Sequence, residues 1–373
     1  MPYHLTIVGA GLAGRLTALY LTDPARRWAK PLQLRLLDQQ VQANRFEPTA
    51  GKVAAAMLCA SAESAVLPPE LWPQARQSIQ LWRELQQQMP GLWLQQQGCI
   101  LLAHTSQLEQ LQHQVRCIAQ NPQASAEPLN SRDLAALEPE LAGRFSQGWW
   151  CPDDGQTQTE SFFSHSSALL QARGVQLQAV SEATLDGSNL SLSGQRQQAN
   201  LVLDCRGLGA SAVWPELRPV RGEVIRLYCP EVQLRRPVRF FHPRYSLYIA
   251  PKPEHQYVVG ATELESASQH GPAVRSVLEL LSALYAVHPG FAEAEVLSIQ
   301  ASARPTLATA QPEIRQQPGL LQLNGLSRHG YLLGPCYAKQ LAELAWQQLH
   351  QRPAPQAAPA VQLSATLPQK DSQ

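Results

Sequence analysis

A glycine-rich turn near the start of the chain limits its fold more than any other feature. The apolar run of residues 5–8 stops at Gly9-Ala10-Gly11-Leu12-Ala13-Gly14, and an apolar stretch follows as far as Leu21. This order is typical of a strand, a tight turn and a helix. In the G-x-G-x-x-G pattern the first glycine permits the turn, the second lets backbone approach a pyrophosphate, and the third allows close packing of helix on strand. The segment therefore predicts a helix N-terminus that faces phosphate groups.

An acidic residue at the expected distance supports this prediction. Residues 32–37 form a second apolar run, which Asp38 closes. An acid at the end of the second strand of such a βαβ unit binds ribose hydroxyls. We therefore predict a dinucleotide site with Gly9, Gly11, Gly14 and Asp38 as its contacts, and a purely structural glycine-rich turn is the alternative. The motif does not distinguish FAD from NAD, because both cofactors use it.

The composition excludes several classes of protein. At roughly 100 to 200 residues per domain, a chain of 373 residues predicts about two to three core-forming units. The hydrophobic fraction of 44% excludes a chain that is disordered throughout. The formal net charge of +1 provides no overall basic field for sequence-independent binding of nucleic acid.

The cysteines and the N-terminus indicate a reducing compartment. The seven cysteines are odd in number and form no C-x-x-C pair, which argues against a disulfide framework and a zinc ribbon, so we predict no metal site. The N-terminus lacks the pattern of a signal peptide, and no apolar run approaches the roughly 18 residues of a membrane span. We expect a cytoplasmic protein with neither a membrane nor a nucleic acid partner.

Helical and strand patterns alternate along the rest of the chain. Apolar residues recur at helical spacing over residues 63–89, 106–119, 277–287 and 337–349. Short strands with polar turns are predicted within residues 173–205 and 220–261. We expect five tryptophans to pack a second domain, namely Trp72, Trp82, Trp93, Trp149 and Trp150.

Four further segments give the chain a resemblance to a known family. They are residues 54–58, the triplet Arg221-Gly222-Glu223, residues 248–251 with 258–262, and residues 303–305 with 324–335. In order and spacing these segments resemble the D-amino-acid-oxidase superfamily of flavoproteins, and most closely its glycine-oxidase and sarcosine-oxidase branch. The resemblance extends over nearly the whole chain and implies FAD as the cofactor.

The resemblance implies an α/β fold with two domains. A Rossmann-like, FAD-binding domain would be assembled from discontinuous segments, residues 1–85, 150–218 and 305–353. A smaller α+β substrate domain with an antiparallel sheet that covers the flavin would comprise residues 86–149 and 219–304. Residues 354–373 are rich in proline and alanine at their start and are expected to form an extended or disordered tail.

The resemblance also implies roles for individual residues. Arg304 would clamp a substrate carboxylate, since a planar guanidinium matches a carboxylate with two parallel hydrogen bonds. Tyr248 would add a hydroxyl to the same anion, and Arg328 would lie beside the flavin and the substrate. The remaining expected cofactor contacts are Ala56, Met57, Val180, Gly207, Gly325, Gly330, Tyr331, Leu332 and Leu333.

Three positions depart from the family pattern or stay open. Thr306 lies near the position of the cysteine that links the flavin in sarcosine oxidases, so non-covalent FAD is expected. Ser246 stands where bacterial glycine oxidases have a histidine, which leaves the substrate undetermined. Lys52 is compatible with a phosphate contact, with a cation that activates oxygen near the flavin, and with a surface charge.

The residues assigned to the substrate also have structural interpretations. Arg304 could be a surface loop arginine, Tyr248 could serve strand packing, and Arg328 could pair with a structural acid. We interpret His329 as structural or solvent-facing rather than as a base, because an oxidase that removes hydride from an amine needs only the neutral amine.

Three functions follow from the resemblance. In the first, a small amine or amino acid such as glycine, sarcosine or a D-amino acid passes hydride to FAD, the imine hydrolyses, and oxygen re-oxidises the flavin to give hydrogen peroxide. In the second, the flavoprotein oxidises side chains of a partner protein during formation of a tryptophylquinone cofactor. In the third, the chain is a flavin-bearing subunit of a multi-subunit dehydrogenase, which would be inactive alone and would expose an apolar patch.

Overall fold

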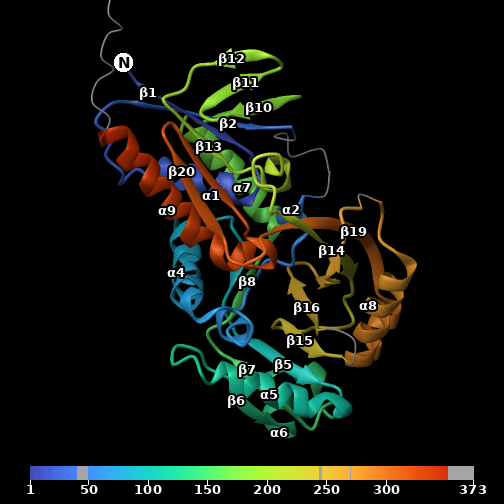
Figure 1. Cartoon of the computed structure of the whole chain (residues 1–373). Helices are drawn as coiled ribbons and strands as arrows, with labels where there is room; N and C mark the ends of the chain where they lie inside the picture. Colours follow the sequence, from blue (N-terminus) through green and yellow to red (C-terminus); the bar gives the residue numbers. More distant parts are fainter. Residues whose placement is uncertain (40–48, 243–245, 269, 352–373) are drawn as a thin grey trace, which may run out of the picture.

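Two large β-sheets organise the protein, and helices pack against both of them (Figure 1). The computed structural model describes residues 1–39, 49–242, 246–268 and 270–351. The predicted tail, residues 354–373, lies outside the described residues. Within the described ranges, no helix combines the length and the apolar character needed to cross a membrane.

The first sheet is largely parallel and contains the predicted βαβ unit. Its strand order is β20-β21-β13-β1-β2-β9, with β1 paired in parallel to β2 and β13 and with an antiparallel hairpin of β20 and β21 at one edge. The strands are β1 (Tyr3–Val8), β2 (Leu32–Asp38), β9 (Gln176–Ala179), β13 (Leu201–Asp204), β20 (Glu313–Gln317) and β21 (Leu320–Asn324). The last four residues of β1 are all buried, as expected of a central parallel strand.

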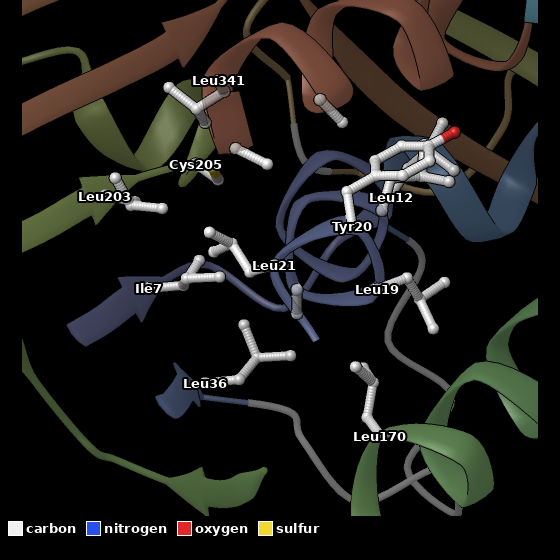
Figure 2. Close-up of a cluster of buried hydrophobic side chains, with 14 of the residues drawn as sticks. Ile7, Leu12, Leu19, Tyr20, Leu21, Leu36, Leu170, Leu203, Cys205 and Leu341 are labelled. Carbon is white, nitrogen blue, oxygen red and sulfur yellow. The ribbon is translucent and has the colours of Figure 1, made fainter. Parts of the chain in front are cut away.

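Helices cover this sheet and build the main core. Side chains of α1 (Leu12–Leu21) point toward the strands on one side and toward α7 (Thr159–Ala172) and α9 (Gly330–Gln351) on the others (Figure 2). Leu19 and Leu21 are 1% and 0% exposed in this core. The helix α4 (Trp72–Gln88) packs on α9 from outside, through Trp82, whose ring stacks on that of Tyr331 at 5.7 Å.

The second sheet is almost entirely antiparallel. Its order is β18-β14-β17-β16-β15-β5-β7-β6, with β19 also paired to β14, and only the β15–β5 pair is parallel among the pairings described. The strands are β5 (Cys99–Ala103), β6 (Glu127–Asn130), β7 (Gln147–Cys151), β14 (Arg218–Tyr228), β15 (Val238–Phe241), β16 (Ser246–Lys252), β17 (Gln256–Gly260), β18 (Leu264–Glu265) and β19 (Glu295–Thr306). Three helices pack beside it, α5 (Leu108–Ile118), α6 (Ser131–Leu137) and α8 (Val274–Val287).

Two small sheets and several short helices complete the fold. One small sheet joins β3 (Met57–Leu58), β8 (Gly155–Thr157) and β4 (Leu94–Gln95). The other is a meander of β10 (Ala183–Asp186), β11 (Asn189–Leu192) and β12 (Gln195–Gln197). The short helices are α2 (Ala50–Val53), α3 (Ala60–Glu63) and the 3-10 turns η1 (Pro69–Leu71), η2 (Thr105–Gln107), η3 (Pro139–Leu141), η4 (Gly207–Ala210), η5 (Pro289–Glu293) and η6 (Ser327–His329).

The predicted α/β fold with a second, antiparallel sheet is confirmed, but some local predictions are wrong. The helix predicted within residues 63–89 is present as α4, which begins only at Trp72, because Pro68 and Pro69 lack the N–H groups that a longer helix requires. The last helix begins at Gly330 instead of residue 337. Trp82 belongs to the core of the first sheet, and Trp72 packs beside that core, so neither packs the second sheet. The two-domain division remains a proposal.

Candidate active site

A cavity of about 1170 Å³ lies where the two sheets meet. Its wall includes the turn after β1, the segment of residues 49–57 and the beginning of α9, all on the side of the first sheet. From the second sheet it includes parts of β14, β15, β16 and β19. The cavity therefore connects the predicted phosphate-binding turn to the residues predicted to hold a substrate.

The glycine turn at one end of the cavity leaves room for a ligand at one glycine only. A Cβ atom on Gly14 would lie 1.9 Å from the carbonyl oxygen of Gly9, so this glycine is required by the packing of α1 on β1. A Cβ atom on Gly11 would meet no atom within 4 Å, because Gly11 faces the open cavity. Ala10 N–H donates to Asp38 Oδ2 at 2.6 Å, which fixes the turn to the end of β2.

These features fit a dinucleotide. Open space in front of Gly11 gives a pyrophosphate access to the backbone N–H groups at the start of α1, which have no acceptor within the helix. Asp38 and Val180 line the cavity beyond the turn, where the ribose and adenine are expected. The residues present thus fit the cofactor that the sequence implied.

Most of the expected cofactor contacts lie on the cavity wall. Those that line it are Gly9, Gly11, Asp38, Ala56, Met57, Val180, Gly207, Gly330, Tyr331 and Leu332. Three expected contacts do not appear among the lining residues, namely Gly14, Gly325 and Leu333. Leu333 is fully buried beside Leu67 and Leu71, and Gly325 has a φ of +79° at the end of β21. The contacts themselves remain predictions.

Arg304 lies on the cavity wall at the other end, on β19. Its guanidinium lies against the backbone of Gly222 on the neighbouring strand β14, where a Cβ atom would be 2.1 Å from Arg304 Nη2. Arg304 Nη1 donates to the carbonyl oxygen of Thr262 at 3.3 Å. Among the described residues, no Asp or Glu forms an ion pair with Arg304, which is partly buried. The guanidinium thus faces the cavity with capacity for an anion.

Tyr248 on β16 lies close to this arginine. It pairs with Gly260 across β16 and β17, and a Cβ atom on Gly260 would lie 3.4 Å from the Tyr248 hydroxyl. Burial raises the pKa of Tyr248, and the positive charges of Arg304 and Arg328 offset part of that rise. The phenol therefore stays protonated at neutral pH and can donate a hydrogen bond into the cavity.

Arg328 also lines the cavity, but it already has carboxylate partners. Its Nη2 lies 2.7 Å from Glu63 Oε2, and its Nη1 lies 3.4 Å from Glu263 Oε2. Glu63 also pairs with Arg239 Nη1 at 2.8 Å and with His329 Nε2 at 3.0 Å. Burial alone would raise the pKa of Glu63, but Arg239 and Arg328 outweigh it and hold this pKa well below its usual range. The structure thus places Arg328 in an ion pair and His329 beside a carboxylate.

Sequence reasoning missed a buried lysine behind the cavity wall. Lys252 Nζ donates to the carbonyl oxygens of Ala55 and Thr157, at 2.8 and 2.7 Å, and to Gln156 Oε1 at 2.9 Å. Burial lowers the pKa of Lys252 to about 7. These bonds hold the cavity-lining segment of residues 54–57 against β8 and β16.

The structure describes two of the three positions that depart from the family pattern or stay open, namely Lys52 and Thr306. Lys52 does not appear among the lining residues, and its Nζ lies 5.7 Å from the ring centre of Phe163. The side chain of Ser246 lies outside what the structure describes. Thr306 Oγ1 lies 2.9 Å from Ser327 Oγ, at the end of β19.

The parallel sheet, the glycine turn and the long cavity define a dinucleotide-binding protein with a second, substrate-covering sheet. A family model described as DAO, FAD dependent oxidoreductase, matches residues 4–344. The chain therefore belongs to this family of FAD-dependent oxidoreductases, and both the family and the FAD cofactor predicted from sequence are confirmed.

Curated relatives share part of their length with this chain. A thiamine biosynthesis oxidoreductase, ThiO, of Rhizobium etli is 36% identical over 211 residues, which is 56% of this chain and 61% of the relative. A bifunctional protein, ThiO/ThiG, of Nostoc sp. is 22% identical over 360 residues, which is 93% of this chain and 53% of the relative. The chain thus spans about half to three fifths of the length of these relatives.

Solved structures of similar fold cover almost the whole chain. Glycine oxidase from Geobacillus kaustophilus has a TM-score of 0.78 and 22% identity, with 95% of this chain and 96% of that chain covered. Iminodiacetate oxidase from Chelativorans sp. has a TM-score of 0.75 and 22% identity, with coverages of 95% and 97%. At these identities the likeness concerns the fold.

The open space at Gly11 leads to a prediction about cofactor retention. Because Gly11 has a φ of −71°, its backbone tolerates a side chain, and the Cβ would project into the cavity without touching protein. We predict that Gly11→Val purifies folded, with a midpoint of thermal unfolding near that of the apoprotein, and with little bound FAD. The ratio of flavin to protein absorbance measures this. Full flavin occupancy in the variant would show that the pyrophosphate does not lie there.

Proposed function

We propose that this protein oxidises a small amine or amino acid that carries a carboxylate group, and that it transfers the hydride to FAD. The observation that carries the proposal is Arg304, a partly buried guanidinium on the cavity wall that pairs with no described Asp or Glu. A buried cation without an anionic partner is costly. A substrate carboxylate would supply that partner with two charge-assisted hydrogen bonds.

The comparisons support an amino acid as substrate. The names of the similar proteins include glycine oxidase, iminodiacetate oxidase and ThiO. Glycine and iminodiacetate are amines that carry carboxylate groups, which is the chemistry that Arg304 fits. We propose molecular oxygen as the electron acceptor, with hydrogen peroxide as the product.

The residues of the chain would contribute mainly by orienting the substrate. Arg304 would bind the carboxylate and the Tyr248 hydroxyl would donate to the same group, so that the α-carbon is held in one position. FAD, when bound, supplies the hydride acceptor. The backbone N–H groups at the start of α9, at Gly330, Tyr331 and Leu332, line the cavity and have no acceptor within the helix, so they would stabilise negative charge in front of them.

One observation favours a different role. Apolar side chains are exposed on α8 and β19, with Val274 at 76%, Leu278 at 60% and Tyr285 at 55% exposure. Val296, Leu297 and Ile299 on β19 are also exposed, at 46%, 46% and 36%. An exposed apolar face is what a flavin-bearing subunit of a larger dehydrogenase would have. Flavin reduction by an amino acid in the isolated chain would exclude dependence on such a partner.

We propose that FAD is held without a covalent bond, because Thr306 lies near the position of the cysteine that links the flavin in sarcosine oxidases. Acid precipitation of the holoprotein is then expected to release all of the yellow chromophore into the supernatant. Colour that stays in the pellet after a denaturing wash would show a covalent link.

The role of Arg304 predicts the effect of its substitution. Loss of a charge-assisted contact to a buried anion costs about 2 to 5 kcal/mol, so Arg304→Ala is expected to weaken binding of carboxylate inhibitors by at least roughly tenfold. Arg304→Lys should restore only part of the affinity for carboxylate inhibitors, because an ammonium group cannot form the two parallel hydrogen bonds of a guanidinium. Spectral titration of the bound flavin measures the affinity.

Arg218→Ala is the matched control, since Arg218 is a half-exposed arginine on the neighbouring strand β14 that pairs with Glu265. It should bind the inhibitors like the wild type. Equal affinity in Arg304→Ala and the wild type, with flavin bound in both, would contradict the proposed carboxylate site.

Substitution of Gly222 gives a second, independent test of the role of Arg304. A methyl group at residue 222 would occupy the place of the Arg304 guanidinium, and the flexible arginine would move in preference to the backbone. We expect Gly222→Ala to raise the KM for the amino acid about tenfold, through lost contacts to its carboxylate, with little change in the unfolding temperature. Gly271→Ala is the control, because a Cβ there meets no atom within 4 Å. An unchanged KM in Gly222→Ala would show that the position of Arg304 does not matter for binding.

A further inference from the structure

Three buried donor groups meet between the small sheet of β3 and the strands β5 and β7. The sulfur atoms of Cys59 and Cys99 and a carboxylate oxygen of Asp154 all lie within 4.8 Å of one another. The three residues are 1%, 0% and 0% exposed. They come from separate parts of the chain, because Cys59 follows β3, Cys99 begins β5 and Asp154 lies in the turn between β7 and β8.

The spacing of these atoms suits a tetrahedral cation. Zinc binds sulfur at about 2.3 Å and carboxylate oxygen at about 2.0 to 2.2 Å, so its ligand atoms lie roughly 3.5 to 3.8 Å apart. Separations of at most 4.8 Å exceed that range by about 1 Å, which side-chain rotations on binding would have to supply. Two thiols and one carboxylate are also donors that zinc selects.

A third thiol lies beside the cluster. Cys151 is the direct partner of Cys99 in the antiparallel pair of β7 and β5, and it is 0% exposed. Side chains directly opposite each other in such a pair lie on the same face of the sheet, with Cβ atoms about 4.5 to 5.5 Å apart. Cys151 lies outside the 4.8 Å group, and its place on the same sheet face as Cys99 makes it the candidate for the fourth ligand that a closed structural site requires.

The carboxylate of Asp154 accepts two backbone hydrogen bonds, which use only part of its capacity to bind other groups. Its Oδ1 accepts from Ser61 N–H at 2.8 Å, and its Oδ2 accepts from Ala62 N–H at 3.1 Å. No Lys, Arg or His of the described residues forms an ion pair with it. Each oxygen keeps a second lone pair, so a cation can bind while both backbone contacts persist.

We propose that Cys59, Cys99 and Asp154, with Cys151 as the fourth donor, bind a thiophilic divalent cation of the zinc class. Binding replaces the thiol protons, which leave to solvent, and transfers no electrons. The cation would join the segment after β3 to the strands β5 and β7. Because Met57 and Glu63 on that segment line the cavity, the bound cation would hold one wall of the cavity in place.

The direct test is the metal content of the purified holoprotein. We expect about one zinc per chain after gel filtration in metal-free buffer, measured by elemental analysis. Adding one equivalent of Cd²⁺ to chelator-treated protein should produce the ultraviolet absorption of a cadmium–thiolate bond. Absence of bound zinc together with absence of this absorption would overturn the proposal, as would a Cys59–Cys99 disulfide detected by peptide mass spectrometry.

Variants locate the site. We expect Cys99→Ser and Asp154→Asn to lose the stoichiometric metal. Cys229→Ser, which removes an equally buried thiol directly after β14, should retain it. Metal retained in Cys99→Ser as in Cys229→Ser would contradict the assignment.

A measurement on the wild type covers the case in which a variant does not fold. Removal of zinc from the holoprotein should lower the unfolding temperature and make the cysteines of the site react faster with a thiol reagent, and added zinc should reverse both effects. If neither the unfolding temperature nor thiol reactivity responds to zinc, the proposal fails. Both readouts are independent of any oxidase activity.

Discussion

The contact between Gly14 and Gly9 is the constraint on which the rest of the structure depends. With no side chain at residue 14, the first turn of α1 comes down onto the backbone at the end of β1. This approach places β1 at the centre of the parallel sheet, between β2 and β13, and buries α1 against α9. It also aims the N-terminus of α1 into the cavity. The core and the cofactor site thus rest on one backbone contact.

The second sheet positions the substrate end of the cavity through its own close approach. Gly222 on β14 leaves space that the guanidinium of Arg304 on β19 fills, and the pairing of these two long strands sets the position of the arginine. Arg328 comes from η6, directly before α9, and is neutralised by Glu63 and Glu263. Of these two cavity-lining arginines, only Arg304 has no carboxylate partner among the described residues. Arg304 is therefore available to a substrate, whereas Arg328 stabilises the cavity wall.

The parts of this structure that could be predicted from the sequence are those encoded locally. The turn from Gly9 to Gly14 and the acid Asp38 belong to one βαβ unit and meet in space through the hydrogen bond from Ala10 N–H to Asp38, so a pattern of residues was sufficient. The role of Arg304 was expected from the resemblance to a known family, and the sequence alone contains no physical reason for its position in the fold. The network around Glu63 and the buried Lys252 could not be predicted, because their partners lie more than 90 residues away and depend on how the sheets pack. The start of α4 after Pro68 and Pro69 also has a local cause, because a proline lacks the N–H group that a continuous helix requires.

The central claim is that a carboxylate held by Arg304 places an amine beside FAD. Anaerobic mixing of the holoprotein with glycine, sarcosine and D-amino acids, and separately with glycinamide, tests it most directly, since the amide keeps the amine but lacks the negative charge. The account predicts that the yellow oxidised flavin bleaches with at least one of the amino acids and stays oxidised with the amide at the same concentration. A flavin that remains oxidised with every amino acid, or that glycinamide reduces as fast as glycine, would contradict it.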